Sequence, residues 1–255
     1  MSGYLTGPRP RALAHRGWHT DELAGLENTA AAFRRAVGEG FRYLETDVHC
    51  TADGVLVAFH DTRLDRVTDR RGQIGDLTWD EVRRARIGGI EPIPRMADLL
   101  AEFPTTHFNI DAKSDAAVGP LAALIEKADA LGRVCVASFS DARLQALRVR
   151  LGPGAALSLG PRQVIRLVAR SRCLPVPLRF PQAVAAQVPV RAGAIPVVTP
   201  GFIRTAHQFG LEVHAWTIDD RAQMERLFDL GVDGIVTDRP DVLREVLRDR
   251  GCWPA

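Results

Sequence analysis

The chain has 255 residues, of which 46% are apolar and 25% are charged. This composition is typical of a folded globular protein and excludes a disordered or collagen-like chain. The 33 Lys and Arg residues nearly balance the 31 Asp and Glu residues. Proteins that bind duplex nucleic acid usually carry a one-sided basic excess, so we expect no nucleic-acid partner. Only Lys113 and Lys127 are lysines, and every other basic residue is an arginine.

The chain has no obvious targeting or disulfide pattern. No stretch reaches the roughly 18 consecutive apolar residues of a membrane span, so we expect no stable membrane insertion. Residues 1–10 lack the basic start and apolar core of a signal peptide, which favours a cytoplasmic location. The four cysteines lie far apart with no C-x-x-C pair, and we predict structural thiols at Cys50, Cys135, Cys173 and Cys252.

Short apolar runs alternate with longer amphipathic runs along the whole chain. Each short run is bounded by Gly, Pro or Asp, as expected of a buried strand. Apolar residues recur between these runs at the three- and four-residue spacing of helices. Glycines follow several of the helical patterns, where a left-handed residue would end a helix: Gly40, Gly152, Gly210 and Gly231. In chain order, the predicted strands cover residues 11–14, 43–48, 55–59, 107–112, 134–138, 155–159, 183–188, 211–217 and 234–237.

About eight alternations of strand and helix in 255 residues predict a (β/α)₈ TIM barrel, although doubly wound sheets share this alternation. Residues 62–104 interrupt the rhythm, because they are polar, rich in Arg and interrupted by Gly and Pro. Short helical patterns occur within them near residues 78–85 and 96–102. We therefore predict a small insertion after the second strand unit, inside a single domain that covers residues 1–255.

Acidic residues gather where the predicted barrel strands end, which is where the active site of a TIM barrel is built. Side chains alternate across a strand, so Glu45 and Asp47 must point the same way. Asp111 lies at the end of another predicted strand. Three converging carboxylates suit Mg²⁺ or Ca²⁺ better than Zn²⁺. Alone, a Glu-x-Asp pair is equally typical of an exposed strand end.

Histidines and cations follow the same strands. His15 and His60 stand at the ends of separate runs, and phosphodiester cleavage needs one group to accept a proton and another to donate one. Arg16 and Lys113 are candidates for binding phosphate. Trp216 lies near a strand end, where it could form a wall of the substrate site or part of the core.

The remaining histidines are more consistent with structural positions. His49 is expected on the strand face that carries Glu45 and Asp47. A lone histidine beside an apolar strand is more often a hydrogen-bonded core or surface residue than a catalyst. We therefore predict structural roles for His19, His107, His207 and His214.

The candidate residues occur in an ordered series of short motifs. These motifs are His15-Arg16-Gly17, Glu27-Asn28-Thr29, Glu45-Thr46-Asp47-Val48, Asp53-Gly54-Val55, Phe59-His60-Asp61, Leu64-Asp65-Arg66-Val67-Thr68, Pro92-Ile93-Pro94, Asp111-Ala112-Lys113, Ala215-Trp216-Thr217 and Asp233-Gly234-Ile235-Val236-Thr237-Asp238-Arg239-Pro240. In this order they resemble the glycerophosphodiester phosphodiesterase family. The resemblance covers about residues 10 to 248 and is weakest between 150 and 200.

The resemblance implies a barrel with a small insertion and hydrolysis of glycerophosphodiesters to glycerol 3-phosphate and an alcohol. It implies a glycerol hydroxyl that attacks phosphorus and water that opens the resulting cyclic phosphate. The resemblance assigns acid–base catalysis to His15 and His60, and the binding of a divalent metal to Glu45, Asp47 and Asp111. It assigns phosphate binding to Arg16 and Lys113, and a supporting role to Glu27 and Asn28.

Two departures from the family pattern leave the substrate open. Many members carry Glu where this chain has Asp111, and Asn is frequent at the position of Asp219. The Asp111-x-Lys113 pair and Trp216 are also similar to phospholipase D-like toxin barrels. A lysophospholipase D that acts on acyl-bearing substrates is therefore an alternative. A barrel that binds metal and phosphate without catalysis is a third reading.

Overall fold

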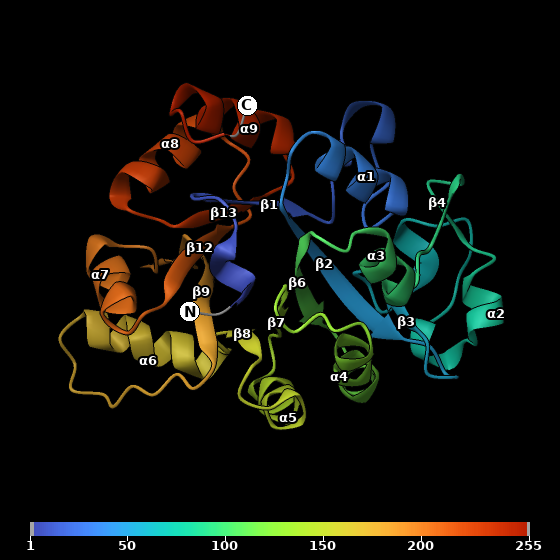
Figure 1. Cartoon of the computed structure of the whole chain (residues 1–255), viewed down its shortest axis with the longest axis horizontal. Coiled ribbons are helices and arrows are strands. Elements are labelled where there is room, and N and C mark those ends of the chain that lie inside the picture. Colours follow the sequence, from blue (N-terminus) through green and yellow to red (C-terminus); the bar gives the residue numbers. More distant parts are fainter. Residues whose placement is uncertain (1–2, 254–255) are drawn as a thin grey trace.

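The computed structural model describes residues 3–253. Within them, parallel strands hydrogen-bond in sequence, and the last pairs with the first, so the sheet closes on itself. The predicted TIM barrel is confirmed (Figure 1). In order around the barrel, the strands are β1 (Arg11–His15), β2 (Tyr43–Cys50), β6 (His107–Ala112), β7 (Val134–Ala137), β8 (Ala156–Ser158), β9 (Ala183–Pro189), β12 (Glu212–Trp216) and β13 (Gly234–Thr237).

Helices follow the barrel strands in turn. Thr29, Ser140, Thr199 and Asp220 each cap the first turn of a helix by accepting a backbone N–H through the side chain. The four predicted helix-terminating glycines all have a positive φ, between +69° and +99°. Gly231 is left-handed as predicted, whereas Gly152 ends α5 with a ψ of −171° and is not. The barrel helices are α1 (Ala30–Gly38), α3 (Met96–Glu102), α4 (Val118–Lys127), α5 (Asp141–Leu151), α6 (Pro161–Ser171), α7 (Pro200–Gln208), α8 (Arg221–Leu230) and α9 (Pro240–Asp249).

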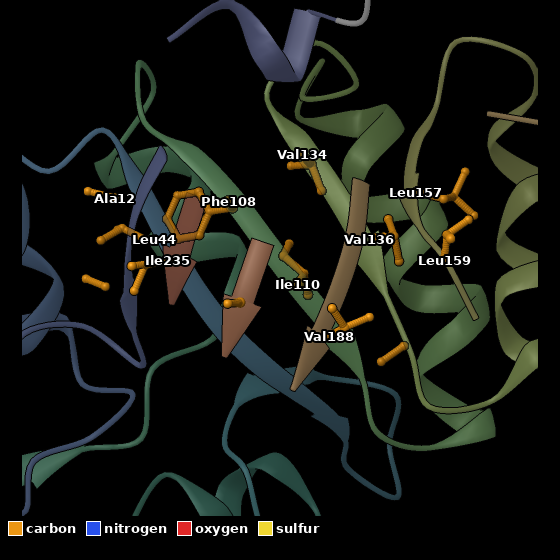
Figure 2. Close-up of a cluster of buried hydrophobic side chains, with 14 of the residues drawn as sticks. Ala12, Leu44, Phe108, Ile110, Val134, Val136, Leu157, Leu159, Val188 and Ile235 are labelled. Atoms are coloured by element: carbon orange, nitrogen blue, oxygen red, sulfur yellow. The ribbon is translucent and has the colours of Figure 1, made fainter. Parts of the chain in front are cut away.

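The alternation of side chains along each strand divides the apolar core into two layers. One set packs between the strands and the surrounding helices, and Figure 2 shows part of it, including Leu44, Phe108 and Ile110. A second, smaller cluster is built from alternate strand positions, such as Leu13 and Tyr43. The strands therefore carry apolar side chains on both faces, with Arg11, Glu212 and His214 as buried polar exceptions near the amino ends of β1 and β12. The acids, histidines and cations of the predicted site gather at the other end.

The predicted strand at residues 55–59 is confirmed, but it does not alternate with helices as the other predicted strands do. This strand, β3 (Leu56–Ala58), pairs antiparallel with the end of β2 and lies outside the barrel closure. Strand β2 has eight residues and is longer than its neighbour β1, and its last three residues pair with β3. The extra strand therefore begins the insertion.

The insertion has its own small core, in which Phe59, Leu64 and Ile74 pack together. By contrast, Met96, Leu99 and Leu100 of α3 pack on the main core, so a barrel helix closes the predicted segment 62–104. The boundaries of a single domain over residues 1–255 stay a prediction.

Short elements of the insertion are η3 (Leu64–Arg66), η4 (Ile74–Asp76), α2 (Trp79–Val82), β4 (Arg86–Ile87) and β5 (Glu91–Pro92). Elsewhere lie η1 (Gly3–Thr6), η2 (Asp21–Leu23), η5 (Asp115–Ala117), β10 (Arg191–Ala192) and β11 (Ile195–Pro196).

The helices of residues 3–253 include none that combines the length and apolar character needed to cross a membrane.

A buried ion pair lies inside the barrel at the amino end of β1. Arg11 is 1% exposed, and its guanidinium donates to both carboxylate oxygens of Glu212, at 3.0 and 2.9 Å. His214 Nε2 lies 3.0 Å from the same carboxylate. Burial alone would raise the pKa of Glu212, but the hydrogen bonds from His214 and Arg11 outweigh burial and lower it to about 2. The charged form is therefore part of the folded state.

Replacing Glu212 by Ala leaves Arg11 buried without a carboxylate. We expect the free energy of unfolding, measured with urea at pH 7, to fall by about 3–5 kcal/mol. Asp98→Ala, which breaks the exposed pair with Arg95, is the control and should cost less than about 1 kcal/mol. Because the folded pKa of Glu212 lies below that of an unfolded Glu, its contribution should be complete above about pH 4.3 and lost as the pH falls towards 2. Equal losses in the two variants would contradict this account.

Candidate active site

Strand register brings the predicted acids together at the carboxyl end of the barrel. His15 is paired with Glu45 across β1 and β2, and Asp47 is paired with Asp111 across β2 and β6. Paired residues of neighbouring strands project to the same side, about 5 Å apart. The three carboxylates therefore line one cavity of about 400 Å³.

All eight predicted site residues border this cavity, although their roles stay predictions. One side is charged, with the acids, histidines and cations. The other side is apolar, and Trp216 contributes to it, packing edge-on against Phe139 with 5.7 Å between ring centroids. The predicted residues on the cavity wall are His15, Arg16, Glu45, Asp47, His60, Asp111, Lys113 and Trp216.

Two cations compensate the most buried acid. Lys113 Nζ lies 2.9 Å from Asp47 Oδ1 and 2.8 Å from Asp111 Oδ2, and Arg16 Nε lies 3.2 Å from Asp47 Oδ2. Burial would raise the pKa of Asp47, but Lys113 and Arg16 together lower it. Burial raises the pKa of Asp111 in spite of Lys113. Burial and the neighbouring Asp47 charge raise the pKa of Glu45 to about 8.

Two oxygens of this cluster have no hydrogen-bond partner although they are buried: Glu45 Oε2 and Asp111 Oδ1. Unpaired buried carboxylate oxygens are costly, and a hard cation is the ligand that satisfies them. Among residues 3–253, no three acidic, His or Cys side chains stand in an arrangement that could hold a metal ion as they are. Lys113 bridges Asp47 and Asp111, so two of the three predicted ligands already pair with a cation of the chain itself. The donor set fits Mg²⁺ or Ca²⁺ in its chemistry.

The carboxylate of Asp238, directly after β13, orients His15. Its Nδ1 donates to Asp238 Oδ1 at 2.6 Å, and Nε2 lies 3.7 Å from Glu45 Oε2. Burial would lower the pKa of His15, but Asp238 and Glu45 raise it. His19, for which we expected a structural role, reaches the same Asp238 oxygen at 3.2 Å. Sequence reasoning assigned no role to Asp238, although one quoted motif runs through it.

His60 is held in the same way, through a chain of charges that reaches into the insertion. Its Nδ1 donates to Asp61 Oδ1 at 2.7 Å. Arg66 of η3 donates to both oxygens of Asp61, at 2.6 and 3.2 Å, and to both oxygens of Glu27, at 2.6 and 3.0 Å. Glu27 in turn accepts from Arg16 at 2.9 Å. One guanidinium therefore connects His60 with Arg16, and neither Asp61 nor Arg66 was predicted as a site residue.

The loop before α1 also supports the acids. Thr29 caps α1, as helix capping predicts, by accepting the N–H of Ala32 at 3.1 Å. Asn28 has a left-handed φ of +58°, donates to Asp47 at 3.3 Å and accepts from Thr46 at 2.8 Å. Since Asn tolerates this conformation better than most residues, the backbone can present its amide to Asp47.

The other four histidines stay off the cavity wall. His49 is buried at the end of β2, and its Nε2 donates to the backbone oxygen of His60 at 3.1 Å. His107 stacks on Tyr43, His207 pairs with Asp233, and His214 lies inside the barrel beside Glu212.

A closed parallel barrel with acids, carboxylate-held histidines and cations around one cavity at its carboxyl end has the construction of a TIM-barrel enzyme. Comparison with known proteins is more specific. A model of the glycerophosphoryl diester phosphodiesterase family matches residues 15–242. The chain belongs to this family, whose members are phosphoric diester hydrolases.

Three relatives show how far the similarity extends. A Mycobacterium tuberculosis protein named "Probable glycerophosphodiester phosphodiesterase 2" is 40% identical, with 95% of this chain and 92% of that protein aligned. Lysophospholipase D GDPD1 of Rattus norvegicus is 26% identical, over 94% of this chain and 86% of its own. The crystal structure of a glycerophosphodiester phosphodiesterase from Agrobacterium tumefaciens superimposes with a TM-score of 0.74 at 25% identity, over 91% of this chain and 97% of that one.

Replacing Arg66 by Met removes the connection between Asp61 and Glu27. We expect kcat for a phosphodiester to fall by about 10–100-fold, because the partners that orient site residues contribute on this scale. The acid side of the pH profile should also move to higher pH, since Arg66 helps to lower the pKa of Asp61 to about 2 and its removal lets this pKa rise. Arg63→Met is the control, because Arg63 is exposed next to η3 and, among the described residues, pairs with Asp65 alone. An unchanged kcat and pH profile in Arg66→Met would show that the connection has no role in the reaction.

Proposed function

We propose that the chain hydrolyses glycerophosphodiesters to glycerol 3-phosphate and an alcohol. His15 and His60 act as the acid–base pair, and Glu45, Asp47 and Asp111 hold a divalent cation, Mg²⁺ or Ca²⁺. One observation carries the proposal: two carboxylate-held histidines and two cations border the same cavity as three buried acids. Family membership and the name of the 40% identical relative support the choice of substrate.

Each histidine has one nitrogen for position and one for proton transfer. Asp238 and Asp61 accept from the Nδ1 atoms, which leaves Nε2 of each ring for exchange with substrate. Cleavage requires one ring to take the proton of the attacking hydroxyl and the other to protonate the departing alcohol. A glycerol hydroxyl next to the phosphodiester is the attacking group in this proposal.

Arg16 and Lys113 bind the phosphoryl oxygens in this proposal. Both cations already contact Asp47, and Arg16 keeps a second carboxylate partner in Glu27. Arg16 therefore keeps its orientation whether or not a phosphate is present, and its planar fork suits two oxygens. When bound, the metal supplies Lewis-acid stabilisation of charge that develops on the phosphoryl oxygens.

The test is the release of glycerol 3-phosphate from glycerophosphocholine, with added Mg²⁺ or Ca²⁺ and after chelation. We expect turnover with at least one of the two ions and its loss in the chelator. His15→Ala and His60→Ala should each lower kcat by about 10²–10⁴-fold, the usual contribution of a positioned acid or base.

His207→Ala is the matched control, since His207 lies on the surface beside Asp233. Turnover that survives chelation would remove the metal from the proposal. Activity at the wild-type level in either site variant would remove that histidine. The absence of turnover with either ion would contradict the substrate class.

A second candidate substrate carries an acyl chain, as in a lysophospholipid. The apolar side of the cavity includes Val164, Val188 and two largely exposed side chains, Phe139 and Ile165, each 67% exposed. Exposed apolar side chains at a cavity mouth are typical of binding sites for apolar groups. The similarity to a lysophospholipase D of the rat agrees with this reading.

Ile165→Ser separates the two substrates. If an acyl chain lies along the apolar side, kcat/KM for lysophosphatidylcholine should fall by about 5–20-fold, because the burial of a Leu- or Ile-sized group contributes about 1.5–3 kcal/mol when complete. Glycerophosphocholine turnover should stay unchanged. Ile90→Ser is the control, as Ile90 is 70% exposed in the insertion and does not line the cavity. An equal loss on both substrates would exclude an acyl subsite here.

A further inference from the structure

The charge of this nearly neutral chain is divided unequally along the sequence. Residues 142–211 contain no Asp and no Glu, but they contain ten arginines. The chain carries +2 overall, so the rest of it carries −8. Such a one-sided distribution indicates a surface that favours an anionic partner.

Six of these arginines are exposed on connected segments beside the cavity, and we name this surface the basic rim. It consists of α6, the loop over residues 172–182 and the β10–β11 hairpin. Arg172 donates to Pro196 O of the hairpin at 3.0 Å, and Gln163 of α6 donates to Arg179 O of the loop at 3.4 Å. Figure 1 shows α6 and the loop that follows it at the outer edge of the molecule, next to α7. The exposed arginines of the rim are Arg162, Arg166, Arg170, Arg172, Arg179 and Arg191.

These arginines are almost free of acidic partners. Among the described residues, a single carboxylate lies within 4 Å of a guanidinium of the basic rim: Asp141, whose Oδ2 is 3.9 Å from Arg162 Nε. Elsewhere on the surface many arginines pair closely with acids, as Arg95 does with Asp98 at 2.7 Å. The positive charge of the rim is therefore uncompensated within the chain.

Apolar side chains are exposed between the arginines. Ile165 is 67% exposed, Leu174 is 53% exposed, and Ile195 is 50% exposed. Each of the three rim segments contributes one of them. Ile165 also lines the cavity, so the basic rim borders the opening of the site itself.

The combination of arginines with exposed aliphatic side chains matches the surface of an anionic lipid bilayer. Arginines bind lipid phosphates, while short apolar groups enter the boundary between headgroups and acyl chains. Single-stranded nucleic acid prefers aromatic platforms, and the exposed large apolar side chains of the rim are aliphatic. A free phosphate ion would need converging donors rather than arginines spread over three segments.

We propose that the basic rim docks the protein peripherally on anionic membranes, with Ile165, Leu174 and Ile195 at the headgroup level. Docking in this way brings the cavity opening to the lipid–water boundary, where the headgroup of an acyl-bearing phosphodiester lies. The inference goes beyond the proposed function, because binding depends on the surface alone and can be measured without turnover.

The test is co-sedimentation of the full chain with vesicles of phosphatidylcholine, with or without phosphatidylglycerol. We expect binding to the anionic vesicles only, and a steep loss of binding as salt is added. The triple variant Arg166→Glu, Arg170→Glu and Arg179→Glu should bind these vesicles at least about tenfold more weakly. Its hydrolysis of glycerophosphocholine in solution should match the wild type, so a failure of docking and a failure of the proposed reaction remain distinguishable.

The control variant carries Arg71→Glu, Arg84→Glu and Arg226→Glu, which make the same change in net charge at exposed arginines outside the basic rim. Its binding should stay within about twofold of the wild type. Equal losses in the two triple variants would show an effect of net charge and overturn the proposal. Equal binding to neutral vesicles would overturn it as well, as would tighter binding to an RNA oligonucleotide than to anionic vesicles.

Discussion

Three buried carboxylates at one end of a barrel impose the constraint on which the site depends. Glu45, Asp47 and Asp111 are 7%, 2% and 5% exposed. Like charges in a poorly solvated space repel strongly, so such a cluster persists only when cations or protons compensate it. Lys113 and Arg16 compensate Asp47, whereas the pKa of Glu45 rises to about 8. The cluster is therefore charged in part, and Glu45 Oε2 and Asp111 Oδ1 have no hydrogen-bond partner.

Charge compensation also extends from the acids to the two histidines of the cavity wall. Asp238 and Asp61 each combine an orienting hydrogen bond with a negative charge beside an imidazole. Asp238 arrives from the end of the chain, because β13 closes the barrel against β1. Asp61 and Arg66 arrive with the insertion, which is anchored where β3 pairs with the end of β2. The insertion therefore contributes to the charge arrangement of the site besides extending the fold.

Local pattern made the barrel and the charged side of the cavity predictable from sequence. Alternation alone sends Glu45 and Asp47 in one direction, and strand ends mark where His15 and Asp111 must gather. Hydrogen-bond partners that come together only when the barrel closes could not be predicted from local pattern. Asp238, the partner of His15, lies 223 residues away from it in the sequence. Helix α6 carries helical spacing in Val164, Leu167 and Val168, but only Leu167 is fully buried, so its pattern is short and weak. The position of the strand at residues 55–59 was not predicted, because a strand pattern does not show which neighbouring strand it pairs with.

The scarcity of lysine has a chemical consequence. The chain has two side-chain amines, since Lys113 and Lys127 are its only lysines. Lys127 is exposed at the end of α4, whereas Lys113 stands on the cavity wall between two carboxylates. The acidic neighbours raise the pKa of Lys113 despite its burial, so its ammonium is protected from acylation at neutral pH. Covalent capture of the enzyme on amine-reactive supports would thus occur through side chains at a single place, remote from the chemistry.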